Sequence, residues 1–188
     1  MANRSYLYSC DYVPGGTEQQ KALIGISEWN YDIPLVFKLL ASGSPQLCKS
    51  SIWDMDEKIA IVSSYEEGVG NLISFLDKID SDMTKSLADE AKAFLRNEKN
   101  RSRYFILECG EIFDMSEEDI FSQNEALLKD LNNIDQTAAQ VIDALAPKQK
   151  SFLQRMFSRT DKASEINPSE VINSLGLGNW SNILYYRF

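Results

Sequence analysis

Histidine is absent from all 188 residues of this chain. It is the side chain best suited to proton transfer near neutral pH and the commonest protein ligand of metals. Its absence therefore excludes histidine-based acyl transfer, nuclease and zinc chemistry. The remaining composition is more typical of a binding protein than of an enzyme.

Cysteine is scarce, and no two cysteines have the spacing of a metal or redox motif. Cys10, Cys48 and Cys109 are odd in number and widely separated. Buried free thiols in a reducing compartment are the simplest interpretation. We therefore expect no disulfide, no zinc or iron site and no cofactor.

Long apolar runs are missing as well. No segment approaches the roughly 20 apolar residues that span a bilayer. The opening residues, 1–13, lack the apolar core and the small-residue cleavage site of a signal peptide. The sequence therefore predicts a cytoplasmic location.

Positively charged residues are fewer than negatively charged ones. The chain has 28 Asp and Glu residues against 19 Lys and Arg residues, a net charge of −9 and a pI near 4.6. Such a chain repels phosphate backbones and anionic lipids, which argues against nucleic acid and membrane surfaces as ligands. A basic protein is the electrostatic complement, and the composition leaves the oligomeric state open.

The hydrophobic pattern predicts a single α+β domain over residues 1–188, mostly helical, with a small sheet of three or four strands. Strands are expected at residues 5–10, 58–65 and 104–109, and residues 183–188 form either a fourth strand or an apolar tail. Apolar spacing predicts helices at residues 34–41, 44–52, 69–79, 83–98, 116–134, 141–145, 147–157 and 168–175. Ser116 is expected to cap its helix, and residues 159–167 are the one plausible linker.

Motifs for catalysis are weak. Cys48, beside Lys49, is the only cysteine with an adjacent cation, but core packing explains its position equally well. No P-loop, G-x-S-x-G or G-x-G-x-x-G pattern is present. Two acidic clusters are expected to be solvated caps and loops: Asp54, Asp56 and Glu57, and Asp77, Asp80 and Asp82.

The second cluster does not have the pattern of a calcium loop. Counting from Asp80, position 6 is Lys85 instead of glycine, and position 12 is Ala91 instead of glutamate. A magnesium site built from carboxylates alone would need acids that converge from distant segments, which the sequence leaves open.

A third acidic group surrounds the end of the best predicted strand. Helix capping accounts for Glu117, Glu118 and Asp119, whereas three other acids have no such local explanation: Glu108, Glu111 and Asp114. They form either a solvated surface or an acidic patch for a basic partner. Three aromatic residues are either core or anchors of a binding surface: Trp29, Tyr31 and Trp53.

Several short sequence motifs occur together in a fixed order: ANRSYLYS at residues 2–9, GISEW at 25–29, SGSPQLC at 42–48, and YFILE followed by MSEED at 115–119. In these motifs the chain resembles an uncharacterised bacterial family whose members open with ANRSYLYS, and the likeness covers residues 2 to about 135. The resemblance implies no reaction, cofactor or site. Acidic cytoplasmic families of this size are similar in general character to immunity proteins of bacterial toxin systems, which is an analogy of class.

The leading hypothesis is a non-enzymatic cytoplasmic protein that neutralises a cognate toxin by occluding its active surface. One alternative is an enzyme with an unfamiliar carboxylate or cysteine site, and another is an adaptor or structural subunit. The predicted partner-binding residues are those named above: Glu108, Glu111, Asp114, Trp29, Tyr31 and Trp53.

Overall fold

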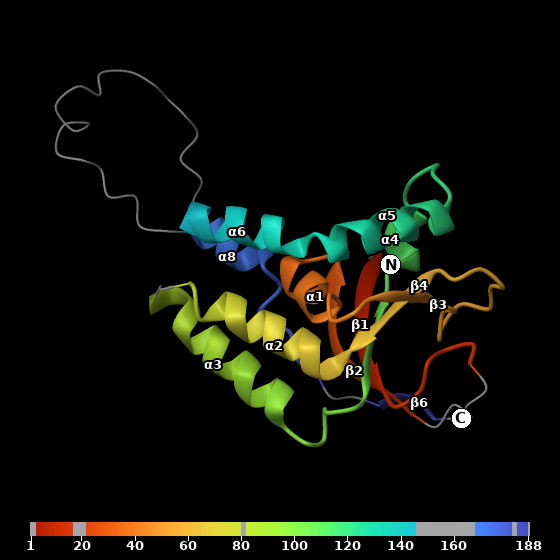
Figure 1. The fold of residues 1–188 in the computed structure, drawn as a ribbon, viewed down its shortest axis with the longest axis horizontal. Helices are drawn as coiled ribbons and strands as arrows, with labels where there is room; N and C mark the ends of the chain where they lie inside the picture. The colour runs from red at the N-terminus through yellow and green to blue at the C-terminus, as the bar shows by residue number, and fades with distance from the viewer. Residues whose placement is uncertain (1–2, 17–21, 80–81, 146–167, 182–183, 188) are drawn as a thin grey trace, which may run out of the picture.

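A computed structural model of the chain describes residues 3–16, 22–79, 82–145, 168–181 and 184–187 (Figure 1). Its centre is a six-stranded sheet in the order β3-β4-β5-β1-β2-β6, with every neighbouring pair antiparallel. The strands are β1 (Arg4–Cys10), β2 (Ala22–Asn30), β3 (Gln46–Cys48), β4 (Ala60–Ser64), β5 (Tyr104–Glu108) and β6 (Leu184–Arg187). The helices are α1 (Leu35–Leu40), α2 (Tyr65–Leu76), α3 (Asp82–Arg96), α4 (Gly110–Phe113), α5 (Ile120–Asn132), α6 (Ile134–Leu145) and α8 (Pro168–Ser174).

This is an α+β fold, but the expected sheet of three or four strands is wrong, because the sheet has six. Strand β2 was not expected, and β3 lies in a segment whose apolar spacing predicted a helix. Three residues are too few for a periodic pattern to separate strand from helix. Pairing of Gln46–Cys48 with β4 decides the conformation there.

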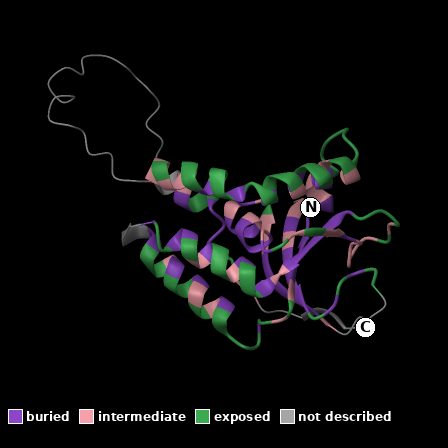
Figure 2. Ribbon diagram, viewed as in Figure 1, coloured by how far each residue is buried: buried purple, intermediate pink, exposed green. Residues whose placement is uncertain are grey.

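The two faces of the sheet are both buried, but by different neighbours. Alternation along β1 places Leu7 on one face and Tyr8 on the other, and both are almost inaccessible to solvent. Leu7 belongs to the main core, which the sheet shares with the helices. Tyr8 belongs to a smaller cluster on the opposite face that includes Cys10, Leu23, Cys48, Val62 and Ile106. Helices α2, α3 and α6 bury their inner sides and expose their outer sides (Figure 2).

Helices α1 and α2 approach each other at a glycine. A Cβ atom on Gly68 would lie 2.0 Å from the carbonyl oxygen of Leu40, so no larger residue fits there without movement of the backbone. The Ser64 hydroxyl accepts a hydrogen bond from the Glu67 backbone N–H and caps α2. The Tyr65 hydroxyl donates to the Leu95 carbonyl (2.8 Å) and ties the start of α2 to the end of α3.

The boundaries of later helices differ in part from expectation. Asp119 caps α5 by accepting from the Ser122 N–H (2.8 Å), three residues beyond the predicted cap Ser116. Gly176, with φ of +85°, follows α8, as predicted from its conformational freedom. The predicted helix at 147–157 and the predicted linker at 159–167 lie outside the described residues.

Among the described helices, none combines the length and the apolar character that a membrane crossing requires.

Candidate functional site

The predicted partner-binding residues lie around one end of the sheet, where β1 begins and β2 and β5 end. Arg4 pairs with Asn30 across β1 and β2, and its backbone N–H donates to Glu111 Oε2 (3.0 Å). The Tyr31 N–H donates to the Asn3 carbonyl (2.8 Å) at the same end. These contacts join the start of β1, the end of β2 and helix α4, which follows β5 directly.

Glu108 is part of this region but is buried. Its side chain is on the sheet face opposite the helices, and the residue is only 1% exposed. Glu108 Oε1 accepts from the Ser51 N–H (2.6 Å), and Oε2 accepts from the Ser50 hydroxyl (2.8 Å). The expectation of a solvated carboxylate is therefore wrong for Glu108, which instead holds the connection between β3 and β4 against the sheet.

Burial also changes the titration of Glu108. Desolvation raises the pKa of this carboxyl from 4.5 to about 7, and the hydrogen bonds from Ser51 and Ser50 oppose the rise. The charged form is therefore costly in the folded protein at neutral pH.

Glu111 and Asp114 have different surroundings. Glu111 is half-buried, and besides Arg4 it accepts a hydrogen bond from the Tyr6 hydroxyl (2.9 Å). Burial, followed by the hydrogen bond to Glu111, raises the pKa of Tyr6 to about 12. Glu111 therefore has a structural role, in contact with Arg4 and Tyr6, that its position in the sequence did not indicate. Asp114 is exposed at the C-terminal end of α4 and remains available to a partner.

Trp53 and Tyr31 are also placed differently. The half-buried Trp53 ring lies against the backbone of α4, because a Cβ atom on Gly110 would be 3.0 Å from its Cε2 atom. Tyr31 is 62% exposed and has a φ of +62°, an uncommon conformation for a non-glycine residue. Tyr31 is therefore the most accessible of the three predicted aromatic anchors.

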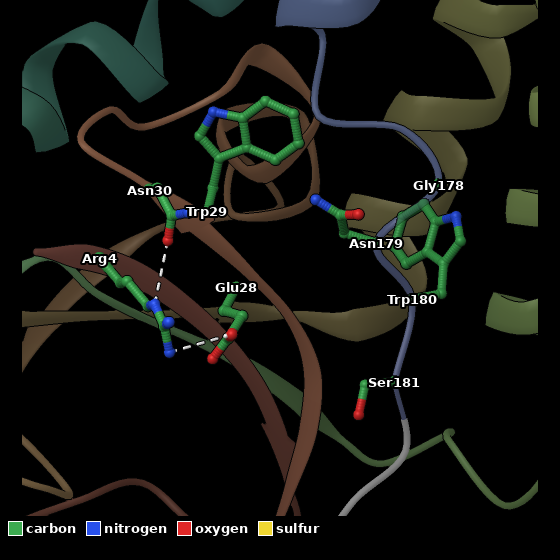
Figure 3. Close-up of a pocket in the computed structure, with 8 residues that line it drawn as sticks. All are labelled: Arg4, Glu28, Trp29, Asn30, Gly178, Asn179, Trp180 and Ser181. Carbon is green, nitrogen blue, oxygen red and sulfur yellow. Dashed lines mark hydrogen bonds and ion pairs between the residues drawn. The ribbon is translucent and has the colours of Figure 1, made fainter. Parts of the chain in front are cut away.

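Trp29 lines a pocket of about 630 Å³ at the outer side of β2 (Figure 3). Its lining residues are Arg4, Glu28, Trp29, Asn30, Gly178, Asn179, Trp180 and Ser181. Arg4 Nη1 and Glu28 Oε1 are 3.1 Å apart, and Arg4 Nε donates to Asn30 Oδ1 (3.0 Å). The pocket is thus bordered by a partly exposed ion pair and by amide groups, while the rings of Trp29 and Trp180 pack partly against the main core.

The far wall of the pocket was missed from the sequence. Segment 178–181 lies beside β2 because Ser27 forms a bridge with Trp180, and the Ser181 N–H donates to the Ile26 carbonyl (2.9 Å). The Ser27 hydroxyl donates to the Asn179 carbonyl (2.7 Å), and the Trp180 ring stacks on Phe94 with 5.4 Å between centroids. Trp180 is about 150 residues from β2 in sequence, and the local pattern gives no indication of this contact. Two glycines that precede Trp180, Gly176 and Gly178, indicate only a turn.

The thiols lie outside this pocket. Cys10, Cys48 and Cys109 are free and buried. Desolvation raises the pKa of Cys10 to about 12, and it also raises the pKa values of Cys48 and Cys109 well above their ordinary range. A high pKa makes a thiol a poor nucleophile at neutral pH. Within the described ranges, no three Cys, Asp or Glu side chains gather in a way that could hold a metal ion.

Comparison with known proteins yields a family but no characterised relative. No curated protein and no solved structure matches the chain. The model of a domain of unknown function, DUF7822, matches residues 11–148, well over half of the 188 residues. The chain therefore belongs to the DUF7822 family.

Proposed function

We propose that this protein is a non-enzymatic binding protein that neutralises a basic protein partner, most concretely an immunity protein that occludes the active surface of a cognate bacterial toxin. The proposal rests on the aromatic and acidic residues that lie together at the end of the sheet around the Trp29 pocket. There Tyr31, Asp32 and Asp114 are exposed, and Trp29 and Trp180 line the pocket while their rings pack partly against the main core. We call this surface the β1/β2 end and define it by Arg4, Glu28, Trp29, Tyr31, Asp32, Asp114 and Trp180.

Charge at the β1/β2 end supports a basic partner. Glu28, Asp32 and Asp114 contribute three carboxylates, and Arg4 contributes one guanidinium that is already paired with Glu28. The chain as a whole carries −9. A surface of this sign steers a basic protein during diffusion and increases its association rate.

Aromatic residues at the same end supply the anchors. Tryptophan and tyrosine are enriched among the few residues that contribute most of the binding energy of protein interfaces. Tyr31 is exposed and is the anchor that a partner can reach directly, whereas Trp29 and Trp180 are half-buried against the main core. Acids that steer and aromatic rings that anchor are the arrangement expected for occlusion of a basic active surface.

The proposal includes a cytoplasmic, bacterial setting. It is supported by the buried free thiols and by the likeness of the opening ANRSYLYS segment to proteins of an uncharacterised bacterial family. This opening segment precedes residue 11, where the DUF7822 match begins.

Growth rescue tests the proposal. The protein is co-expressed in a bacterial host with the toxin domain encoded beside its gene, and binding of the purified pair is measured by calorimetry. We expect rescue and a one-to-one complex, and we expect Tyr31→Ala to weaken binding by about tenfold or more, as for a hot-spot residue. Val13→Ala, which changes another exposed apolar side chain beyond the opposite end of β1, is the matched control and leaves affinity unchanged.

Two results would contradict the proposal. The first is a neighbouring gene product that neither binds the protein nor is neutralised by it. The second is an affinity that is indifferent to Tyr31→Ala, which would remove the β1/β2 end as the binding face.

A further inference from the structure

The pocket beside Trp29 lies across the edge of the sheet and not on one of its faces. Consecutive residues of a strand direct their side chains to opposite faces. Figure 3 shows Glu28 directed toward Arg4 and away from the Trp29 ring, which packs partly against the main core on the helix side. Residues from both faces therefore border this pocket, and a matching ligand has to present groups to both faces in turn.

The backbone of Asn30 faces outward along this pocket. The Tyr31 N–H donates to the Asn3 carbonyl (2.8 Å) and therefore faces β1. In the trans peptide group that joins Asn30 to Tyr31, the C=O of Asn30 points the opposite way, away from β1. Because the N–H and C=O of one residue in an antiparallel strand face the same side, Asn30 presents both groups at the outer edge of β2.

The chain that flanks β2 on this edge stops short of Asn30. Strand β6 pairs only with Ala22–Ile24, and segment 178–181 continues beside β2 as far as Ser27. Gly178 has a φ of +94°, which is not the conformation of an extended strand, so the segment does not continue the ladder. Within the described chain, the outward N–H and C=O of Asn30 form no backbone hydrogen bond.

An extended polypeptide is the ligand that matches these features. The free end of β2 borders a pocket of about 630 Å³ whose far side is segment 178–181, and this volume is within the range of roughly 300–1,000 Å³ typical of ligand pockets. Exposed strand edges accept further strands through main-chain hydrogen bonds. A strand placed beside Asn30 would direct one side chain toward the Trp29 side of the sheet and the next toward the Glu28 side.

We propose that an extended segment of the basic partner adds to the sheet here as a short strand and exchanges N–H···O=C hydrogen bonds with the backbone of Asn30. This inference rests on the proposed function, and it names the mode by which the partner is bound. A basic segment is favoured over a second copy of this chain, because two copies of charge −9 repel each other and Asp32, beside the free edge, is exposed.

Hydrogen exchange of the full-length protein without a partner tests the free edge. The protein is labelled with nitrogen-15, and exchange rates are corrected for the intrinsic rate of each amide. We expect the Asn30 amide to exchange about tenfold or more faster than the Tyr31 amide, which is bonded to the Asn3 carbonyl. A protected Asn30 amide would overturn the proposal: protection that depends on protein concentration would assign the edge to a second copy, and protection that does not would assign it to another segment of this chain.

A short basic peptide, acetyl-Lys-Val-Lys-Val-Lys-amide, tests strand addition directly. Main-chain bonds are tolerant of side-chain identity, so we expect saturable shifts at millimolar peptide and about tenfold slower exchange of the Asn30 amide at saturation. The control peptide has a methyl group on every backbone nitrogen, which keeps its charge but removes its backbone donors and blocks close approach to the edge. Equal shifts with both peptides, or no shifts up to the solubility limit of the first, would overturn the proposal.

A matched pair of variants tests the outward N–H. Asn30→Pro and Asn30→Ala both lose the side-chain hydrogen bond from Arg4 Nε (3.0 Å), but only proline lacks the backbone N–H. We expect Asn30→Pro to bind the peptide about tenfold more weakly than Asn30→Ala does. Urea unfolding shows whether both variants fold, and if the proline variant does not, the methylated peptide tests the same bonds on the wild type.

The outcomes also separate this inference from the proposed function. Partner neutralisation that folded Asn30→Pro and Asn30→Ala support equally refutes strand addition and leaves neutralisation standing. Pairing of the peptide with Asn30, together with a neighbouring gene product that the protein does not bind, refutes neutralisation and leaves the strand site standing.

Discussion

Replacement of Glu108 by glutamine is expected to change how stability depends on pH. The pKa of Glu108 is about 7 in the folded protein and 4.5 in its ordinary environment. Between these values the folded state binds more protons than the unfolded state, so the free energy of unfolding falls as pH rises. The contribution of neutral Glu108 is complete below about pH 4.5 and is lost as pH rises through about 7.

The magnitude follows from the two pKa values. One pKa unit corresponds to about 1.4 kcal/mol, so ionisation of Glu108 lowers the free energy of unfolding by about 3 kcal/mol between about pH 4.5 and pH 8. Glutamine stays neutral and can still accept the hydrogen bond from the Ser51 N–H. The stability of Glu108→Gln relative to the wild type should therefore rise by about 3 kcal/mol across this range.

Urea unfolding at a series of pH values measures this difference. Other titrating groups contribute to both proteins and cancel in the comparison. Ser50→Ala is the second variant, since loss of its hydrogen bond removes an influence that lowers the pKa of Glu108, and the midpoint of the pH effect should move upward. Parallel stability profiles for the wild type and Glu108→Gln from pH 5 to pH 8 would refute the reasoning.

Three further predictions concern the fold. Gly68→Ala should destabilise the protein by more than about 2 kcal/mol in urea unfolding, because the new Cβ atom would lie 2.0 Å from the Leu40 carbonyl oxygen. A loss of stability below about 0.5 kcal/mol would show that α1 and α2 separate easily. Asp119→Ala should lower stability by about 1 kcal/mol through loss of the hydrogen bond from the Ser122 N–H, and an unchanged urea midpoint would argue against this cap. A thiol reagent should label none of the buried cysteines in the folded protein and all three after unfolding: Cys10, Cys48 and Cys109. A reductant should leave the melting temperature unchanged, because no disulfide constrains the unfolded chain. Rapid labelling of the native state would contradict the burial of the thiols.

Local patterns in the sequence determined several elements of this fold. The apolar, β-branched and aromatic runs predicted β1, β4 and β5, and the spacing of apolar residues predicted α1 and α3 close to their observed bounds. The same spacing predicted α2, but at 69–79 instead of the observed Tyr65–Leu76. Gly176 marked the end of α8 through its access to positive φ. These signals are readable because they depend on residues three or four positions apart, or on a single backbone conformation.

Tertiary contacts decided the rest. The width of the sheet depends on β3, which is strand only because it pairs with β4. Glu108 looks like a surface acid in sequence, yet its burial depends on Ser50 and Ser51, which approach it from another part of the chain. The Trp29 pocket needs Trp180 beside β2, and no local pattern records a contact between segments so far apart. The spacing of residues in the sequence determines geometry only over a few positions. The burial of a side chain, its pKa and the lining of a pocket depend on contacts between distant segments, and therefore only the tertiary structure could reveal them.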